Sequence, residues 1–456
     1  MRKEMFNHEI TILRDTYRRL LRRNAKINLK KLTGKTHPAD LAEVFRHFSI
    51  EEQIEIFSLM KENEHAAEFL VELDDALVIE LLENESYDRI ATIIEKAPTN
   101  DQSGILNILG NEKAQSIIEL LNAEEQEEIA EIMGYPDDSA GTLMNTEVFT
   151  LHESITAGEA IQTLQDQEGA EMVFYLYITD DDDRLVGVIS LRALTTTPSS
   201  TKLKDIMIKN IHSIRPETDQ EDVAKIVAQY NFLAVPVLDS DSKLLGIVTV
   251  DDVVDVIREE ATEDFLRMAG AGKDREILLK SSWENAKARL PWLFASWIGG
   301  IVAASIIGAF ENMLANILAL AAFIPVILGM GGNIATQSST IIVRGMATGR
   351  VNIGGEIKLI FKEIKVGFIL GSLYGILLGA FAKFTFTNAP DNLGFVVGLS
   401  ICASMIVAAT VGTIIPLILR KLDIDPAIAT GPFVTTSIDI LGVLFYFLIA
   451  GIFLRI

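Results

Sequence analysis

Cysteine is almost absent from this chain of 456 residues. The one cysteine, Cys402, lies in an apolar run, so the chain has neither a disulfide framework nor a cysteine-based metal site. No nucleophile–base pair and no glycine-rich phosphate loop stands out, which argues against an enzyme. The first 35 residues are basic and amphipathic without a continuous apolar stretch, so we expect no signal peptide.

Basic residues are too few to balance the acidic ones in the front of the chain. Of the 40 basic and 63 acidic residues, 11 and 8 lie from Ser281 onward, which leaves 29 and 55 in residues 1–280, a net charge of −26. This acidity argues against nucleic acid as a partner and favours cations. The back of the chain is instead apolar, so we expect an acidic soluble part followed by a membrane part.

Five apolar segments follow Leu290, and each is long enough to cross a bilayer, which takes about 20 residues. We expect these spans at 291–310, 314–343, 364–387, 393–419 and 427–454. Basic residues cluster at 344–365 and at 420–421, whereas Lys383 is the single base in the other two connections. The positive-inside rule therefore predicts a multi-pass protein of the plasma (inner) membrane, with its N-terminus in the cytoplasm and its C-terminus outside.

The last span carries a carboxylate, Asp439, near its middle. A charge at that depth costs at least ~2.5 kcal/mol, so an intramembrane Asp is by default a functional residue. We interpret it as part of a cation pathway, and a polar tie between two helices is the alternative. Thr435 and Thr436 precede it by four and three residues, which places both hydroxyls on its face of a helix.

The second span contains IPVILGMGGNIATQSST, a run rich in small and polar residues. Pro325 and the glycines weaken a helix, and broken backbone at membrane depth is tolerated where it lines a cavity. We therefore expect an irregular pore lining at Gly329 and Gly332, with Asn333 as a neutral oxygen donor. Close helix packing through small residues is the alternative. One carboxylate with several neutral oxygens suits a hard cation.

The soluble part divides into two regions. Residues 36–134 show recurring helical spacing of apolar residues and predict an all-α superhelical N domain after a basic N-terminal helix at 1–35. Residues 137–257 contain a repeat, because LVGVIS at 185–190 matches LLGIVT at 244–249. Asp-rich turns join the strands of each copy, which predicts an α+β tandem.

Residues 258–290 connect this tandem to the membrane part. They read as one amphipathic helix or two, with no breaker before Gly270, and the region around their start is dense in carboxylates. Asp252, Asp255 and Glu259 share one face, with Glu263 a turn further on. Like charges at that spacing repel, so a bound cation would stabilise the helix, and a solvated acidic face is the alternative.

Two resemblances follow from these motifs. NFLAVPVLD followed by LLGIVTVDDVVDVI resembles a cystathionine-β-synthase (CBS) repeat, and such pairs sense adenine nucleotides or ions, which makes ATP a candidate ligand. PVILGMGGNIATQSST and DPAIATGPFVTTSID are similar to the MgtE family of magnesium transporters, over essentially the whole chain. The family implies a multidomain fold: a helical N domain, a CBS pair, an acidic connecting (plug) helix at 258–290 and a transmembrane domain of five spans at 291–456.

The family resemblance also implies roles for individual residues. It implies a homodimer with a pore between the fifth spans, in which Asp439 matches the pore aspartate, and Mg²⁺ both as transported ion and as regulator. The residues that match regulatory Mg²⁺ ligands are Asp219, Glu221, Asp252, Asp255, Glu260, Glu263 and Asp264, and Asp101 and Glu259 are further candidates. Asn231 and Gly431 depart from the family pattern.

Three other functions remain open from the residues alone. A proton- or sodium-coupled carrier would use Asp439 as a proton relay. A CBS-regulated anion transporter is disfavoured because the middle of the spans carries no basic residue. A Mg²⁺ sensor without transport would not need an intramembrane carboxylate. The sequence does not select among Mg²⁺, Mn²⁺, Co²⁺ and Zn²⁺.

Overall fold

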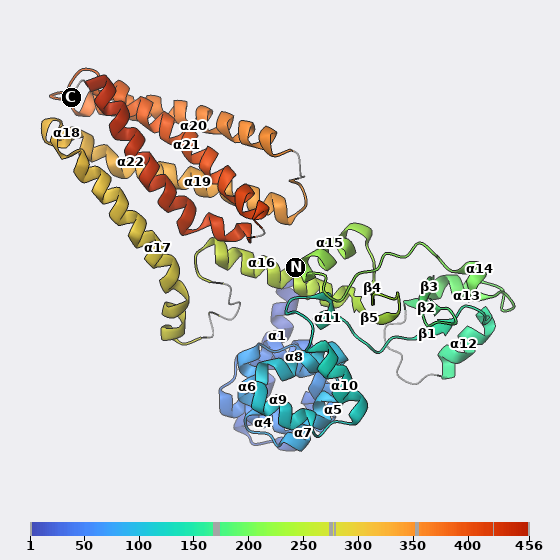
Figure 1. Cartoon of the computed structure of the whole chain (residues 1–456). Coiled ribbons are helices and arrows are strands. Elements are labelled where there is room, and N and C mark those ends of the chain that lie inside the picture. The colour runs from blue at the N-terminus through green and yellow to red at the C-terminus, as the bar shows by residue number, and fades with distance from the viewer. Residues whose placement is uncertain are drawn as a thin grey trace. The chain divides into compact units, whose positions relative to one another are not determined.

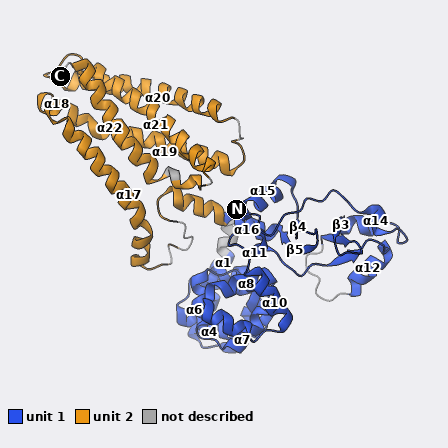
Figure 2. Ribbon diagram, in the orientation of Figure 1, with its two compact units in different colours: residues 1–258 blue, residues 259–456 orange. Residues whose placement is uncertain are grey.

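The computed structural model describes residues 2–166, 174–272, 277, 280–351, 355–422 and 424–454. The chain divides into two compact units, residues 1–258 and residues 259–456 (Figure 2). Figure 1 shows that the first unit contains short helices followed by two small sheets, whereas the second is built from long helices.

The front of the first unit is a stack of short helices. Odd-numbered helices pack on one another in one row (α1, α3, α5, α7, α9) and even-numbered helices in a second (α2, α4, α6, α8, α10). This confirms the predicted helical N domain. The helices are α1 Arg2–Arg22, α2 Lys26–Thr33, α3 Pro38–Phe45, α4 Ile50–Ser58, α5 Asn63–Val71, α6 Asp75–Leu82, α7 Tyr87–Ile94, α8 Thr99–Leu109, α9 Asn111–Ile118, α10 Ala123–Ile132 and α11 Ala140–Leu143.

Local sequence sets where these helices begin, and buried aromatic residues hold the rows together. Ser49 and Ser86 cap α4 and α7 through their hydroxyls, which satisfies backbone donors that a helix start leaves unpaired. Phe45, Phe57 and Phe69 are fully buried, and the rings of Phe45 and Phe69 meet edge to face at 4.9 Å. The superhelix therefore has a continuous core along the two rows.

The remainder of the first unit is the CBS pair. Its elements are β1 Thr150–His152, α12 Ala157–Asp166, β2 Tyr175–Thr179, β3 Leu185–Ser190, α13 Leu191–Thr196, α14 Leu203–Ile206, α15 Gln220–Tyr230, β4 Ala234–Leu238 and β5 Leu244–Thr249. The first sheet has the order β1-β2-β3, with β1 parallel and β3 antiparallel to β2, and β4 pairs antiparallel with β5 in the second. In the second copy a parallel bridge from Ile214 to Val237 stands in the place of β1. The predicted tandem is confirmed.

The described residues of the segment 258–290 belong to two helices that extend beyond it and to the connection between them. Its front belongs to α16 (Val250–Met268), which starts directly after β5, and Gly270 follows that helix with a φ of +68°. Its end forms the first turns of α17 (Ser282–Ala309), which begins at a capping box made by Ser281 and Glu284. The first long apolar helix therefore begins nine residues before Pro291, where we had expected the span to start.

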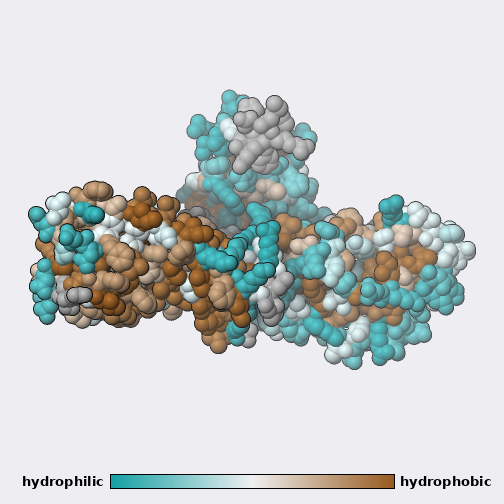
Figure 3. Space-filling view, turned by 90° about the horizontal axis from the view of Figure 1, so that it is seen from above, coloured by the Kyte–Doolittle hydropathy of each residue, from teal (hydrophilic) through white to brown (hydrophobic). Residues whose placement is uncertain are grey.

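Among the described residues of the second unit, five helices are long and apolar enough to cross a membrane, which confirms the predicted number of spans. Its elements are α17, α18 Glu311–Asn316, η1 Leu318–Phe323, α19 Ile324–Ala347, α20 Glu356–Thr385, α21 Leu393–Lys421, η2 Pro426–Thr430 and α22 Pro432–Leu454. Figure 3 shows hydrophobic side chains over the surface of these helices. Ile376 and Phe384 of α20 are among the large apolar side chains that are exposed. Such a surface suits lipid rather than water.

Two expectations about the second unit were wrong. The backbone does not break at the glycines, because α19 runs continuously through Gly329 and Gly332. The basic cluster at 344–365 is not a loop either, since Arg344 lies in the last turn of α19 and Lys358, Lys362 and Lys365 lie on α20. Packing against α21 and α22 holds α19 helical despite its low helix propensity.

Candidate functional site

Asp439 lies on α22 between Ile438, which is buried, and Ile440, which is partly buried. Its own side chain is partly buried, and among the described residues it makes no hydrogen bond and no ion pair. A carboxylate at this depth of an apolar helix is costly unless an ion or another chain neutralises it. An ion or group that neutralises Asp439 would therefore have to come from outside the described residues of this chain.

Helix α19 approaches α22 next to this carboxylate. A Cβ on Gly331 would lie 2.9 Å from Cγ2 of Ile438, so the glycine allows the two helices to meet one residue before Asp439. Gly331 and not Gly329 or Gly332 is the close-packing residue, because a Cβ on either of the latter meets nothing within 4 Å. Asn333 is exposed two residues beyond this contact.

The two threonines before Asp439 have different surroundings. The Thr435 hydroxyl donates to the backbone oxygens of Gly431 and Pro432 at 3.4 and 3.3 Å, which leaves its lone pairs available as acceptors. Thr436 packs against Gly299 of α17, where a Cβ would overlap its methyl group. Thr435 therefore remains a candidate oxygen donor, whereas Thr436 serves helix packing.

A second carboxylate in the membrane helices was missed by the sequence reasoning. Glu363 on α20 is 6% exposed, and Ser338 on α19 donates a hydrogen bond of 2.9 Å to its Oε2. The Ser338 hydroxyl is therefore engaged within the protein. Glu363 lies between Lys362 and Lys365, so we assigned it from the sequence to the basic connection between two spans.

The first unit brings together carboxylates from α8 and from the start of α16. Burial raises the pKa of Asp101 to about 7, and repulsion from Asp252, Asp251 and Asp255 adds to the rise. Asn100 donates from Nδ2 to Asp252 Oδ1 at 3.1 Å, which joins the two helices. The buried Asn100 Oδ1 has no hydrogen-bond partner among the described residues. Asn100 was not predicted, although it precedes Asp101 in the same turn.

The other predicted ligands do not gather at one place. Asp219 caps α15 by accepting from the Glu221 amide at 2.8 Å, Glu221 pairs with Lys225 at 3.1 Å, and Asp255 pairs with Arg258 at 3.1 Å. Glu259, Glu260, Glu263 and Asp264 follow along α16, and each has a partner. Within the described ranges, no three His, Cys, Asp or Glu side chains form a group that could hold a metal ion.

The end of α16 is attached to the start of α22 within the second unit. Arg267 pairs with Glu263 on its own helix and with Asp425, the residue that caps η2. Burial lowers the pKa of Arg267, but the carboxylates of Asp425 and Glu263 beside its guanidinium outweigh burial and raise the pKa. A Cβ on Gly431 would lie 3.6 Å from the backbone oxygens of Arg267 and Met268, which is ordinary van der Waals contact, so Gly431 lies against the end of α16.

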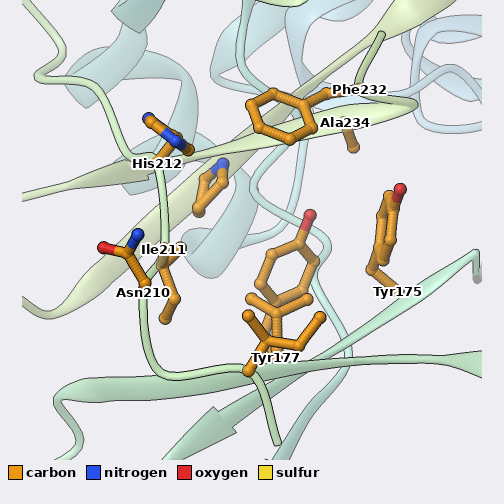
Figure 4. A pocket seen from close by; sticks show the side chains of 10 residues that line it. Tyr175, Tyr177, Asn210, Ile211, His212, Phe232 and Ala234 are labelled. Atoms are coloured by element: carbon orange, nitrogen blue, oxygen red, sulfur yellow. The ribbon is translucent and has the colours of Figure 1, made fainter. Parts of the chain in front are cut away.

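A cavity of about 170 Å³ lies between the two CBS copies and is lined mainly by aromatic and aliphatic side chains. Figure 4 shows Tyr175, Tyr177, His212 and Phe232 around it. His212 stacks on Tyr230 with ring centroids 4.3 Å apart, and the buried hydroxyl of Tyr177 has no hydrogen-bond partner in the described part of the chain. A flat base with a polar edge suits such a cavity.

Comparison with protein families divides the chain in the same order. Residues 324–449 match the MgtE divalent cation transporter model, residues 36–138 the MgtE intracellular N domain, and residues 140–198 and 203–259 the CBS domain. The fold and these matches define a class of multi-span membrane proteins for divalent cations that carry a CBS pair.

Full-length relatives and solved structures narrow the class further. The chain is 33% identical to the magnesium transporter MgtE of Bacillus subtilis over 96% of both chains, and 34% identical to that of Thermus thermophilus over 94% of this chain and 95% of the relative. The cytosolic domain of the Mg²⁺ channel MgtE in complex with ATP is 31% identical, with a TM-score of 0.51 over 53% of this chain and 99% of that one. The chain belongs to the MgtE family of magnesium transporters.

Proposed function

We propose that this protein takes up Mg²⁺ across the plasma membrane through a pore formed by two copies of the chain. The observation that carries the proposal is Asp439, a carboxylate on a membrane-spanning helix without a partner among the described residues. Two such carboxylates on a two-fold axis would match the charge of one divalent cation. The full-length relatives from Bacillus subtilis and Thermus thermophilus, both named as magnesium transporters, support Mg²⁺ as the ion.

The residues beside the proposed pore suit a partly hydrated ion. Mg²⁺ sheds its water reluctantly and prefers oxygen ligands at about 2.0–2.1 Å in octahedral geometry. One carboxylate from each copy gives too few ligands for a complete protein cage. The Asn333 amide and the Thr435 hydroxyl would therefore hold the waters of the ion, and Gly329 and Gly332 would leave room for it because no side chain projects there.

Flux measurements in proteoliposomes test the pore. Asp439→Ala and Asp439→Asn should abolish or severely reduce Mg²⁺ uptake in protein that is still folded and dimeric. Asp391→Asn, which changes an exposed acid before α21, should retain uptake. Normal uptake by either Asp439 variant would refute the pore. Uptake that follows an imposed pH gradient would instead indicate the coupled carrier, and parallel assays with Mn²⁺, Co²⁺ and Zn²⁺ measure selectivity.

Cytosolic Mg²⁺ regulates the pore, in this proposal, through the acidic residues of the first unit and of α16. Asp101, Asp252 and the unpartnered oxygen of Asn100 form an oxygen-only set, which suits a hard cation. Such an ion would relieve the repulsion between the carboxylates of α8 and α16. It would favour a form in which the two helices are in contact, because it binds that form more tightly than one in which they are apart. The remaining carboxylates of α16, from Asp255 to Asp264, would bind Mg²⁺ in a form in which their present partners have moved.

ATP is the proposed ligand of the cavity between the CBS copies. The support is the aromatic lining, the unpartnered Tyr177 hydroxyl and the similarity to a cytosolic domain solved with ATP. The adenine ring would stack against the Phe232 and His212 side chains. ATP should bind the wild-type chain in calorimetry and bind Phe232→Ala at least about fivefold more weakly, since one aromatic contact to a base is worth about 1–3 kcal/mol. Equal binding by both proteins would place ATP elsewhere.

A further inference from the structure

A groove on the membrane part of the second unit has no assigned occupant. It lies between α20 and α21, has a volume of about 480 Å³ and is lined mainly by apolar groups. The lining includes Ile376, Ala380, Phe395 and Leu399. Ile376 and Phe395 are 73% and 59% exposed, so the groove opens on the hydrophobic surface of the spans.

Backbone contacts form the floor of this groove. A Cβ on Gly375 would lie 2.6 Å from the Gly398 oxygen, and a Cβ on Gly379 would lie close to the Gly394 oxygen, so the two helices touch without intervening side chains. The larger side chains beside these glycines stand at the edges of the groove. The depression is therefore a fixed feature of the helix pair, and in a bilayer it must be filled by an acyl chain or by another protein.

Lys383 closes one end of the groove and is the only charged residue in its lining. Its stem packs on Gly394, and its ammonium group has no ion pair among the described residues. The opposite end of the same helix pair differs, because there Lys421 pairs with Glu356 at 2.9 Å. A lysine at the border of the apolar surface without a carboxylate beside it favours an external anion.

We propose that this groove binds an anionic phospholipid, with one acyl chain along the glycine floor and the phosphate on Lys383 Nζ. The apolar lining suits the acyl chain of the lipid, and the positive charge of Lys383 favours a negatively charged headgroup. The lipid belongs to the leaflet that contains the end of α20 at Thr385. A basic residue near a membrane surface contributes about 1 kcal/mol toward anionic lipid, which corresponds to about a fivefold preference.

Quenching of a tryptophan in the groove by brominated lipid tests this site. Phe395→Trp places the probe in the lining, and Trp283, Trp292 and Trp297 are replaced by Phe to remove the background. In the full-length protein, dibromo-phosphatidylglycerol should quench the probe with about fivefold stronger binding than dibromo-phosphatidylcholine. Lys383→Gln should remove this preference, Lys383→Arg should keep it, and Lys362→Gln, at the other end of α20, should leave it unchanged.

Three outcomes would overturn the proposal. Equal quenching by the two lipids in the protein that retains Lys383 would show that the groove has no preference for an anionic lipid. An undiminished preference in Lys383→Gln would place the anion elsewhere. Absence of quenching by either lipid would show that protein, such as a second copy of the chain, covers the groove. Ala380→Leu, which narrows the groove at an exposed position, should weaken quenching by both lipids together.

Discussion

Removing the charge of Asp101 should stabilise the metal-free first unit, and the gain should grow with pH. Burial and three neighbouring aspartates raise the pKa of this carboxyl from 3.8 to about 7. Its folded pKa is thus above its unfolded pKa, so the folded form binds the proton more tightly. The stability that this proton contributes is complete below about pH 4 and is lost as the pH rises to 7.

The size of the effect follows from the same pKa values. A rise from 3.8 to about 7 corresponds to about 4 kcal/mol at pH 8, since each pH unit is worth 1.36 kcal/mol. Asp101→Asn keeps the shape of the side chain and never ionises. It should therefore raise the free energy of unfolding by up to about 4 kcal/mol at pH 8 and by little at pH 4, before screening by salt reduces the figure.

Equilibrium urea unfolding of residues 1–272, followed by circular dichroism, measures this difference. This fragment contains the first compact unit and the whole of α16. In the wild type, Mg²⁺ should recover more stability at pH 8 than at pH 5, because protons and Mg²⁺ compete for the same carboxylates. Asp101→Asn should lose most of that response, whereas Asp88→Asn, an exposed acid in the first turn of α7, should keep it.

Two results would refute the reasoning. If Asp101→Asn and the wild type have the same free energy of unfolding at pH 8 without Mg²⁺, the carboxylate is not held beside the other three. If Asp101→Asn is more stable but responds to Mg²⁺ as the wild type does, the repulsion is real and the ion binds at another place.

Further expectations concern the second unit and the topology. Arg267→Glu should speed proteolysis between α16 and α17, because it places three carboxylates together, and the exchange of Arg267 and Asp425 should restore protection. Glu363→Ala should lower the melting temperature followed by tryptophan fluorescence, while Glu363→Gln should largely retain it by keeping the bond from Ser338. A cysteine at Asn388, with Cys402 replaced by Ser, should react with an impermeant reagent from outside the cell, and reaction only after permeabilisation would reverse the predicted orientation.

The repeat and the spans were predictable because they depend on local pattern. Alternating apolar residues with Asp-rich turns specify each hairpin of the CBS pair, and an apolar run of about 20 residues specifies a membrane span. The continuity of α19 was not predictable in this way. Its glycines and Pro325 lower helix propensity, but packing at Gly331 and at Gly412 of α21 stabilises the helix, and propensity is a weak guide where tertiary contacts decide.

Residues that act through distant partners escaped the sequence reasoning. Asn100 meets Asp252 from a position 152 residues away, and Arg267 meets Asp425 across 158 residues. Neither residue has a signature that distinguishes it from an ordinary surface polar residue. Glu363 was concealed by its basic neighbours, and only the fold shows that it faces Ser338.

The continuity of α16 explains why both of its ends matter for the proposed regulation. Asp252, near its start, lies beside Asp101, and Arg267, near its end, pairs with the residue that caps η2 directly before α22. The fifteen residue steps from Asp252 to Arg267 span about 22 Å at 1.5 Å per residue. A helix of that length without Gly or Pro in its interior resists bending, since sharp kinks require such residues. In the proposed regulation, a change of charge at the acidic start of α16 would therefore move this helix as one body.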